Sequence, residues 1–193
     1  MYEIRLHGLG GEGVVVASEL LGKAAMKQGM WSHSFPFFGT DIRGGAVKAF
    51  TRIDGKKISV KSYIYRPDIL LLFNDILLND PEVTLGADSS TLMIVNTRSG
   101  IDELRNCTAA KQGATLIPID ATDLGYKIFN RPIFNVIMLG ALLKMREVVT
   151  KDVLAQVITE ELPGRVVQGN LTALDEGYLS MEGVVKDETP LVG

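Results

Sequence analysis

Three segments of almost unbroken hydrophobicity constrain the fold of this chain more than any other feature. They are "PDILLLFN" (67–74), "TLMIVNT" (91–97) and "ATLIPID" (114–120). Short apolar runs without alternation are typical of strands buried on both faces, as the central strands of a parallel sheet are. A helix predicted over 102–111 separates the second run from the third. Buried strands that alternate with helices predict an α/β fold.

The remaining pattern adds elements at both ends. "YEIRL" (2–6) alternates like a strand, and a helix that begins at Val14 is expected to end at Gly29. "AVKAFTRIDGKKISV" (46–60) predicts a β-hairpin that turns at Asp54-Gly55 and adds an antiparallel component to the sheet. Three helices are expected in the C-terminal part, over 135–145, 151–162 (capped by Thr150) and 170–181.

Together these elements predict a three-layer α/β/α fold with a mixed, mainly parallel sheet, a Rossmann-like start and a helical C-terminal part. We expect one domain over residues 1–180 and a C-terminal tail over 181–193. No linker or repeat divides the chain, and 193 residues suffice for one full hydrophobic core.

Composition excludes several classes of function. The net charge of −3 argues against a nucleic-acid-binding protein, which usually carries a basic face. No apolar run is long enough to span a membrane, and the N-terminus has no signal-peptide pattern, so we expect a cytoplasmic protein. One cysteine, Cys107, and two histidines are too few for a zinc site or an iron–sulfur cluster. We therefore expect no metal on this chain itself.

The stretch "LHGLGGEGVV" (6–15) contains the dinucleotide-binding pattern G-x-G-x-x-G at Gly8, Gly10 and Gly13. Such a site also needs an acidic residue about 20 residues later, where "MWSHSFPF" has none. Two interpretations remain open. The loop amides, at the positive end of a helix, suit an anionic group, although Glu12 opposes anion binding. Alternatively, the glycines only permit a tight turn and close packing.

"MWSHS" (30–34) predicts a short extended piece, and "FPFFGTDIRGG" (35–45) is too rich in glycine, proline and aromatic residues to predict regular structure. Its aromatic side chains are expected to pack inward or against another chain, with Phe35, Phe37 and Phe38 as an apolar interface patch. Asp41 and Arg43 either form an ion pair that fixes the loop, or Arg43 binds a carboxylate or phosphate.

These motifs resemble the gamma subunit of the 2-oxoacid:ferredoxin oxidoreductases. That family shows a G-x-G-G-Q-G loop, here 8–13, and about 25 residues later a Y-G-x-E-x-R-G-G segment, here 38–45. The closing segments "NVIMLGALLK" (135–144) and "QGNLTALDEGY" (168–178) also resemble the family's helices. Three residues depart from the pattern: Glu12 replaces Gln, Phe38 replaces Tyr and Asp41 replaces Glu. These changes remove an amide and a phenol as hydrogen-bonding groups.

The resemblance implies a chain that acts within a complex. Thiamine diphosphate lies between the alpha and beta parts of such complexes, and the iron–sulfur clusters lie in beta, delta or equivalent chains. The reaction is the oxidative decarboxylation of a 2-oxoacid, usually to its acyl-CoA, with electrons passing to ferredoxin or to a flavoprotein subunit. The gamma chain would carry neither cofactor but would help to form the environment of coenzyme A and substrate.

The resemblance assigns candidate binding residues but no catalytic residue to this chain. The candidates are Gly10, Gly11, Glu12, Gly13, Phe38, Gly39, Asp41, Arg43, Gly44 and Gly45. The alternative is a stand-alone Rossmann-type oxidoreductase that binds NAD(P). The missing acidic residue counts against that alternative.

Overall fold

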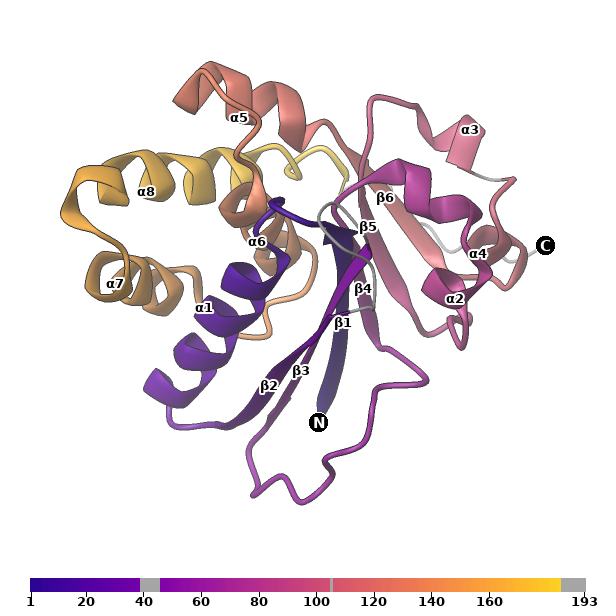
Figure 1. The fold of residues 1–193 in the computed structure, drawn as a ribbon, viewed down its shortest axis with the longest axis horizontal. Coiled ribbons are helices and arrows are strands. Elements are labelled where there is room, and N and C mark those ends of the chain that lie inside the picture. Colours follow the sequence, from indigo (N-terminus) through magenta and orange to yellow (C-terminus); the bar gives the residue numbers. More distant parts are fainter. Residues whose placement is uncertain (39–45, 105, 185–193) are drawn as a thin grey trace.

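Six strands form one mixed sheet in a computed structural model that describes residues 1–38, 46–104 and 106–184 (Figure 1). The strands are β1 (Tyr2–Leu9), β2 (Trp31–Phe38), β3 (Ala46–Asp54), β4 (Ile69–Leu72), β5 (Leu92–Asn96) and β6 (Thr115–Ile119). Their spatial order is β2-β3-β1-β4-β5-β6. Strands β1, β4, β5 and β6 run parallel, whereas β3 runs antiparallel to both β1 and β2. The predicted α/β fold with a mixed, mainly parallel sheet is confirmed.

Helices cover both faces of this sheet. One face packs against α1 (Val14–Lys27), α5 (Ala121–Phe129), α6 (Asn135–Met145), α7 (Lys151–Glu161) and α8 (Gly164–Leu179), seen on the left of Figure 1. The other face packs against η1 (Asp75–Asn79), α2 (Pro81–Thr84), α3 (Ile101–Leu104) and α4 (Thr108–Lys111). Side chains of β4 alternate between the two cores: Ile69 and Leu71 enter the larger one, Leu70 and Leu72 the smaller one.

The larger core depends on close contact between α6 and α8. A Cβ atom added at Gly140 of α6 would overlap the Leu174 carbonyl oxygen and lie 2.8 Å from the Tyr178 amide nitrogen. A Cβ at Gly177 of α8 would overlap the Ile137 carbonyl oxygen in the same way. Glycine at both positions therefore lets the two helix backbones touch.

Several helix boundaries follow the sequence pattern. Helix α6 spans the predicted residues 135–145, and the Thr150 hydroxyl accepts a hydrogen bond from the Val153 amide at the start of α7. Gly29 adopts a positive φ of 82° just beyond α1, as expected for a helix end. The third C-terminal helix, α8, begins at Gly164, six residues before its predicted start.

Three local predictions were wrong, and one helix was missed. Residues 56–60 form no strand, because β3 is flanked by β1 and β2 and has no free edge for a hairpin partner. Residues 35–38 are not irregular but complete β2, whose edge position tolerates Pro36. The helix expected over 102–111 is divided into α3 and α4. Helix α5, with Asp120 as its N-cap, was not predicted.

Basic side chains are buried on the face of β1 and β3 opposite α1. Arg5 is 5% exposed, and its guanidinium donates to the carbonyls of Ile64 (3.3 Å) and Val83 (2.5 Å). Burial lowers the pKa of Arg5 to about 10. Burial also holds the pKa of His7 well below its usual value, with smaller contributions from the charges of Arg5 and Lys48. The His7 side chain is therefore neutral in the folded protein at neutral pH.

Among the described residues, no helix is long and apolar enough to cross a membrane.

Candidate functional site

A polar cleft of about 360 Å³ lies at the carboxyl ends of the parallel strands. The segment after β1 crosses to the face of α1, whereas the segment after β4 crosses to the opposite face. Ligands of open α/β sheets bind at such a switch point, where neighbouring connections leave in opposite directions. The cleft is lined by Glu12, Phe73, Asn74, Asp75, Asn96, Thr97, Arg98, Asp120, Thr122, Pro132 and Phe134.

Glu12, in the glycine loop, lines the cleft and forms two hydrogen bonds with neighbouring segments. Its carboxylate accepts hydrogen bonds from the Leu9 amide (2.6 Å) and from the Asn74 side-chain amide (2.8 Å). The side-chain oxygen Oδ1 of Asn74 in turn accepts a hydrogen bond from the Ile76 amide, which fixes the orientation of the Asn74 side chain. Glu12 thus ties the loop after β1 to the segment after β4. Its negative charge lies next to Gly13, the N-cap of α1, but no described side chain forms a capping hydrogen bond at this helix start.

Close packing explains two glycines of the loop. A Cβ at Gly13 would lie 2.8 Å from the side-chain nitrogen of Asn135, and Gly13 also has a positive φ of 81°. A Cβ at Gly8 would lie 2.6 Å from Val14 and 2.9 Å from Phe73. Gly11, in contrast, is exposed, with open space where a Cβ would lie. Gly11 has a positive φ of 97°, which favours glycine in a turn, so the interpretation as a tight turn with close packing accounts for Gly8, Gly11 and Gly13.

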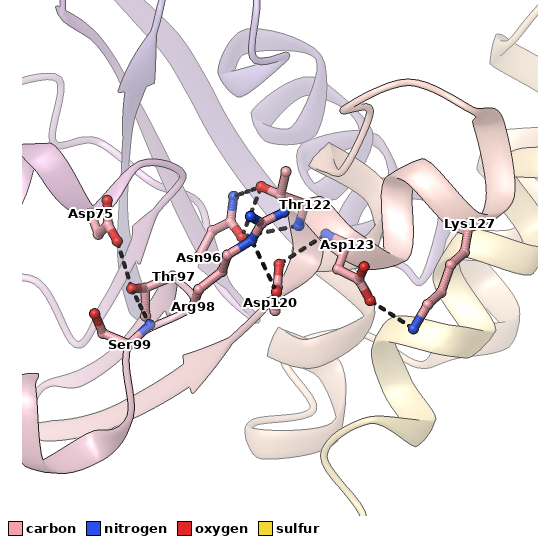
Figure 2. A network of polar contacts seen from close by, with 9 residues as sticks. All are labelled: Asp75, Asn96, Thr97, Arg98, Ser99, Asp120, Thr122, Asp123 and Lys127. Atoms are coloured by element: carbon pink, nitrogen blue, oxygen red, sulfur yellow. Dashed lines mark hydrogen bonds and ion pairs between the residues drawn. The ribbon is translucent and has the colours of Figure 1, made fainter.

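Paired side chains from neighbouring strand ends form the far wall of the cleft (Figure 2). The Asn96 side-chain amide donates to the Thr122 hydroxyl at 2.9 Å and to the Phe73 carbonyl at 3.0 Å. The Thr97 hydroxyl donates to the Asp75 carboxylate at 2.6 Å. These bonds join the segments at the ends of β4, β5 and β6, and so they restrict the movement of this wall.

A single ion pair lies at the mouth of the cleft. Arg98 lies 3.4 Å from the Asp120 carboxylate, and its side chain is 72% exposed. Asp120 also accepts the Asp123 amide at the start of α5, as Figure 2 shows. The lining contains three carboxylates and one guanidinium. This charge balance favours a hydrogen-bond donor or a cationic group over a phosphate. Within the described ranges, no group of three His, Cys, Asp or Glu residues suits a metal ion.

The structure places part of the predicted site at this same edge of the sheet. Residues 10–13 connect β1 to α1, and Phe38 is the last residue of β2. Val47 of β3 pairs with Phe38 of β2 on one side and with Gly8 of β1 on the other. The glycine loop after β1 and the segment that follows Phe38 therefore begin at the same end of the sheet. The other predicted residues, Gly39, Asp41, Arg43, Gly44 and Gly45, lie outside the described residues.

Sequence reasoning missed the polar residues of the cleft wall. Asn96 is the last residue of β5, Asp120 follows β6 directly, and Asn74 lies two residues beyond the end of β4. Because the carboxyl ends of parallel strands meet at one edge, that position is a signal that could have found them. All three lie within the hydrophobic segments 67–74, 91–97 and 114–120, but none of them was predicted as a site residue.

An open, mostly parallel sheet with helices on both faces and a polar crevice at its strand ends defines a doubly wound α/β protein. The chain belongs to the pyruvate ferredoxin/flavodoxin oxidoreductase family, whose model matches residues 3–180. The resemblance predicted from the motifs is therefore confirmed.

Individual relatives match over nearly their whole length. The chain is 38% identical to the pyruvate/ketoisovalerate oxidoreductases common subunit gamma of Thermococcus kodakarensis, over 92% of this chain and 96% of that protein. It is 36% identical to pyruvate synthase subunit PorC of Methanothermobacter marburgensis, over 94% and 98% respectively. The crystal structure of pyruvate oxidoreductase subunit PORC from Thermotoga maritima is similar with a TM-score of 0.81 and 30% identity, covering 92% and 95% of the two chains.

Proposed function

We propose that this chain is the gamma subunit of a 2-oxoacid oxidoreductase complex that depends on thiamine diphosphate and iron–sulfur clusters. The reaction would be the oxidative decarboxylation of a 2-oxoacid to its acyl-CoA, with electrons passed to ferredoxin or a related acceptor. The observation that carries this proposal is the match of nearly the whole chain to gamma subunits of pyruvate and ketoisovalerate oxidoreductases. Alpha, beta and delta type subunits would be its partners.

The residues of this chain do not fit the redox cofactors of such a complex. An iron–sulfur cluster needs several cysteine thiolates, and the sequence has only Cys107. The proposal therefore places thiamine diphosphate and the clusters on the other subunits, and the isolated chain would be inactive. The site proposed on this chain is the Gly10–Gly13 loop with Phe38, Gly39, Asp41, Arg43, Gly44 and Gly45. It would face an anionic group of coenzyme A or a neighbouring subunit.

The sheet topology argues against the alternative, a stand-alone NAD(P)-dependent oxidoreductase. In a dinucleotide-binding fold, the strand after the first helix lies beside β1 and carries the acid that binds ribose. Here β3 separates β2 from β1, and β2 contains no acidic residue, so it cannot supply that acid beside β1.

Anaerobic purification of the tagged chain from its source organism tests the proposal. We expect larger subunits to copurify with iron and thiamine diphosphate, and the complex to reduce viologen with pyruvate or a branched-chain 2-oxoacid in the presence of coenzyme A. A colourless chain without partners would overturn the assignment. In the assembled complex, Arg43→Ala should lower turnover; unchanged assembly and turnover would remove the proposed role of Arg43.

A further inference from the structure

An exposed basic segment links β3 to β4. Residues 55–66, here called the basic strap, carry Lys56, Lys57, Lys61 and Arg66 and contain no acidic residue, although the whole chain has a net charge of −3. All four side chains are exposed. None of the three lysines forms an ion pair with another described residue. The charge of these lysines is therefore not neutralised within the described part of the chain.

Buried arginines hold the basic strap against the sheet. Arg52 is 1% exposed and donates to the carbonyls of Ser62 (2.7 Å) and Tyr63 (3.3 Å). Arg5 donates to the carbonyl of Ile64, whose side chain is buried. The strap has no helix or strand, and Figure 1 shows it as a long connection beyond the lower end of β3. Because the backbone of the basic strap is fixed at these three carbonyls, binding of a partner to the strap would cost less conformational entropy than binding to a free loop.

Aromatic rings extend the same surface toward β2. Ser32 and Ser34 face α1, so Phe35 and Phe37 point to the opposite side of the strand. The centroid of the Tyr63 ring lies 5.3 Å from that of Phe50, in a stacked arrangement, and 5.4 Å from that of Phe37, in an edge-to-face arrangement. Tyr63 is 45% exposed and Phe37 36% exposed. Rigid aromatic rings at an exposed edge are typical anchors of protein interfaces.

Tyr65 continues this aromatic surface along the strap, with its ring 6.5 Å from that of Tyr63 and its side chain 63% exposed. Strand β2 is the outermost strand of the sheet, so its outer backbone groups are also open to a partner. Lysines without an ion-pair partner among the described residues, on the same exposed segment as Tyr63 and Tyr65, favour an acidic protein surface. A nucleic acid would need a broader basic face, which a chain of net negative charge lacks.

We propose that the basic strap and the rings of Phe37, Tyr63 and Tyr65 form a docking surface for an acidic face of another subunit. This inference rests on the proposed function, because it assigns the surface through which the chain joins its complex. The rings would fill the buried centre of the interface, and the lysines would steer and orient the partner from its rim.

A charge-reversal variant tests this surface in the assembled complex. The variant carries Lys56→Glu, Lys57→Glu and Lys61→Glu, and the control carries Lys111→Glu, Arg146→Glu and Arg165→Glu, which are exposed elsewhere and change the net charge equally. Each tagged chain replaces the native copy in the source organism. We expect the first variant to retain its subunits at least about tenfold less tightly, with the difference shrinking in high salt, and the control to assemble normally.

Tyr65→Ala provides an independent variant that leaves the charges unchanged, and we expect it to weaken assembly too. Amine-reactive labelling of the unchanged complex gives a second readout, in which Lys56, Lys57 and Lys61 should be protected and Lys111 should not. Equal assembly of both triple variants, with these lysines still reactive in the complex, would overturn the docking surface while leaving the proposed function intact. A chain that purifies alone even without substitutions would overturn both. Binding of the strap to duplex DNA or anionic vesicles, with assembly unaffected, would also refute the acidic-protein partner.

Discussion

At the scale of single residues, the site is defined by a carboxylate where the family's pattern has an amide. Glu12 accepts two hydrogen bonds, from the Leu9 amide and the Asn74 side chain. A glutamine at this position has one acceptor oxygen and one NH₂ group, so it cannot accept both bonds in the same geometry. Asn74 also cannot turn its amide without losing the Ile76 bond. The pair Glu12–Asn74 is therefore a matched unit.

A double-mutant cycle measures this match. Glu12→Gln should lower the free energy of unfolding by about 1–2 kcal/mol, because one donor loses its acceptor. Adding Asn74→Asp should restore most of that loss, since an aspartate accepts both from the new amide and from Ile76. Urea denaturation of the two single variants and the double variant checks the coupling. Additive effects would show that the two side chains act independently.

The buried His7 gives the stability a pH dependence. Its pKa is lowered in the folded state, so below about pH 6.5 the unfolded chain binds a proton that the folded chain rejects. The contribution of neutral His7 to the free energy of unfolding is therefore fully present above that pH. It falls as the pH decreases, by at most about 1.4 kcal/mol per pH unit. The groups around it, Arg5 and Lys48, strengthen the effect because both are positive.

Denaturant unfolding between pH 5 and 7.5 tests this contribution. His7→Gln should flatten the pH dependence, whereas His33→Gln should do so less, because His33 is more exposed and burial lowers its pKa less strongly. Parallel stability curves for the unchanged chain and His7→Gln would contradict the assignment.

At the scale of elements, the contact between α6 and α8 organises the larger core. Eight of the eleven residues of α6 are buried, so this helix is apolar all round and must be covered on every side. Helix α8 covers it through Gly140 and Gly177, where the backbones touch. Charged pairs such as Lys27–Glu160 (2.8 Å) then join α1 to α7 at the surface, where they contribute little.

Substitution of one interface glycine tests the importance of this contact. Gly140→Ala should destabilise the protein by about 3 kcal/mol, because its Cβ meets backbone atoms that cannot move separately. Gly164→Ala is the matched control: nothing lies within 4 Å of its Cβ, so we expect a change within about 0.5 kcal/mol. Thermal unfolding followed by circular dichroism compares the two, and equal melting temperatures would contradict the proposed contact.

At the scale of the whole molecule, the two faces of the sheet are unequally covered. Long helices pack on the larger core, whereas α3 and α4, on the smaller core, have only four residues each. Helices this short have little stability of their own and depend on a few buried contacts such as Leu104 and Ala109. The helices on the two faces of the sheet should therefore unfold locally at different free energies.

Amide hydrogen exchange measures this difference. We expect the amides of α6 to exchange only through global unfolding, and those of α3 and α4 through local opening at a free energy lower by about 2 kcal/mol or more. Because the cleft wall at Thr97 and Arg98 leads into α3, ligand or partner binding there should slow exchange in this segment first. Uniform protection of both faces would contradict the expectation.

The sequence determined those features that depend on neighbours along the chain. Hydrophobic runs located β4, β5 and β6, helical spacing located α1 and α6, and the Thr150 cap marked the start of α7. Four short motifs were enough to indicate the family. Each of these signals is local, because the period of buried side chains and the caps act over a few residues.

Only the tertiary structure decided which distant segments meet. Strand β3 pairs with β1 and β2 rather than with residues 56–60. Phe35 lies in β2, where it pairs with Phe50 of β3 and the centroids of the two stacked rings are 5.0 Å apart. The Glu12–Asn74 bond joins residues 62 positions apart. The free energy of such contacts depends on which surfaces the whole fold brings together, and so local pattern determined the elements while long-range packing determined the cleft.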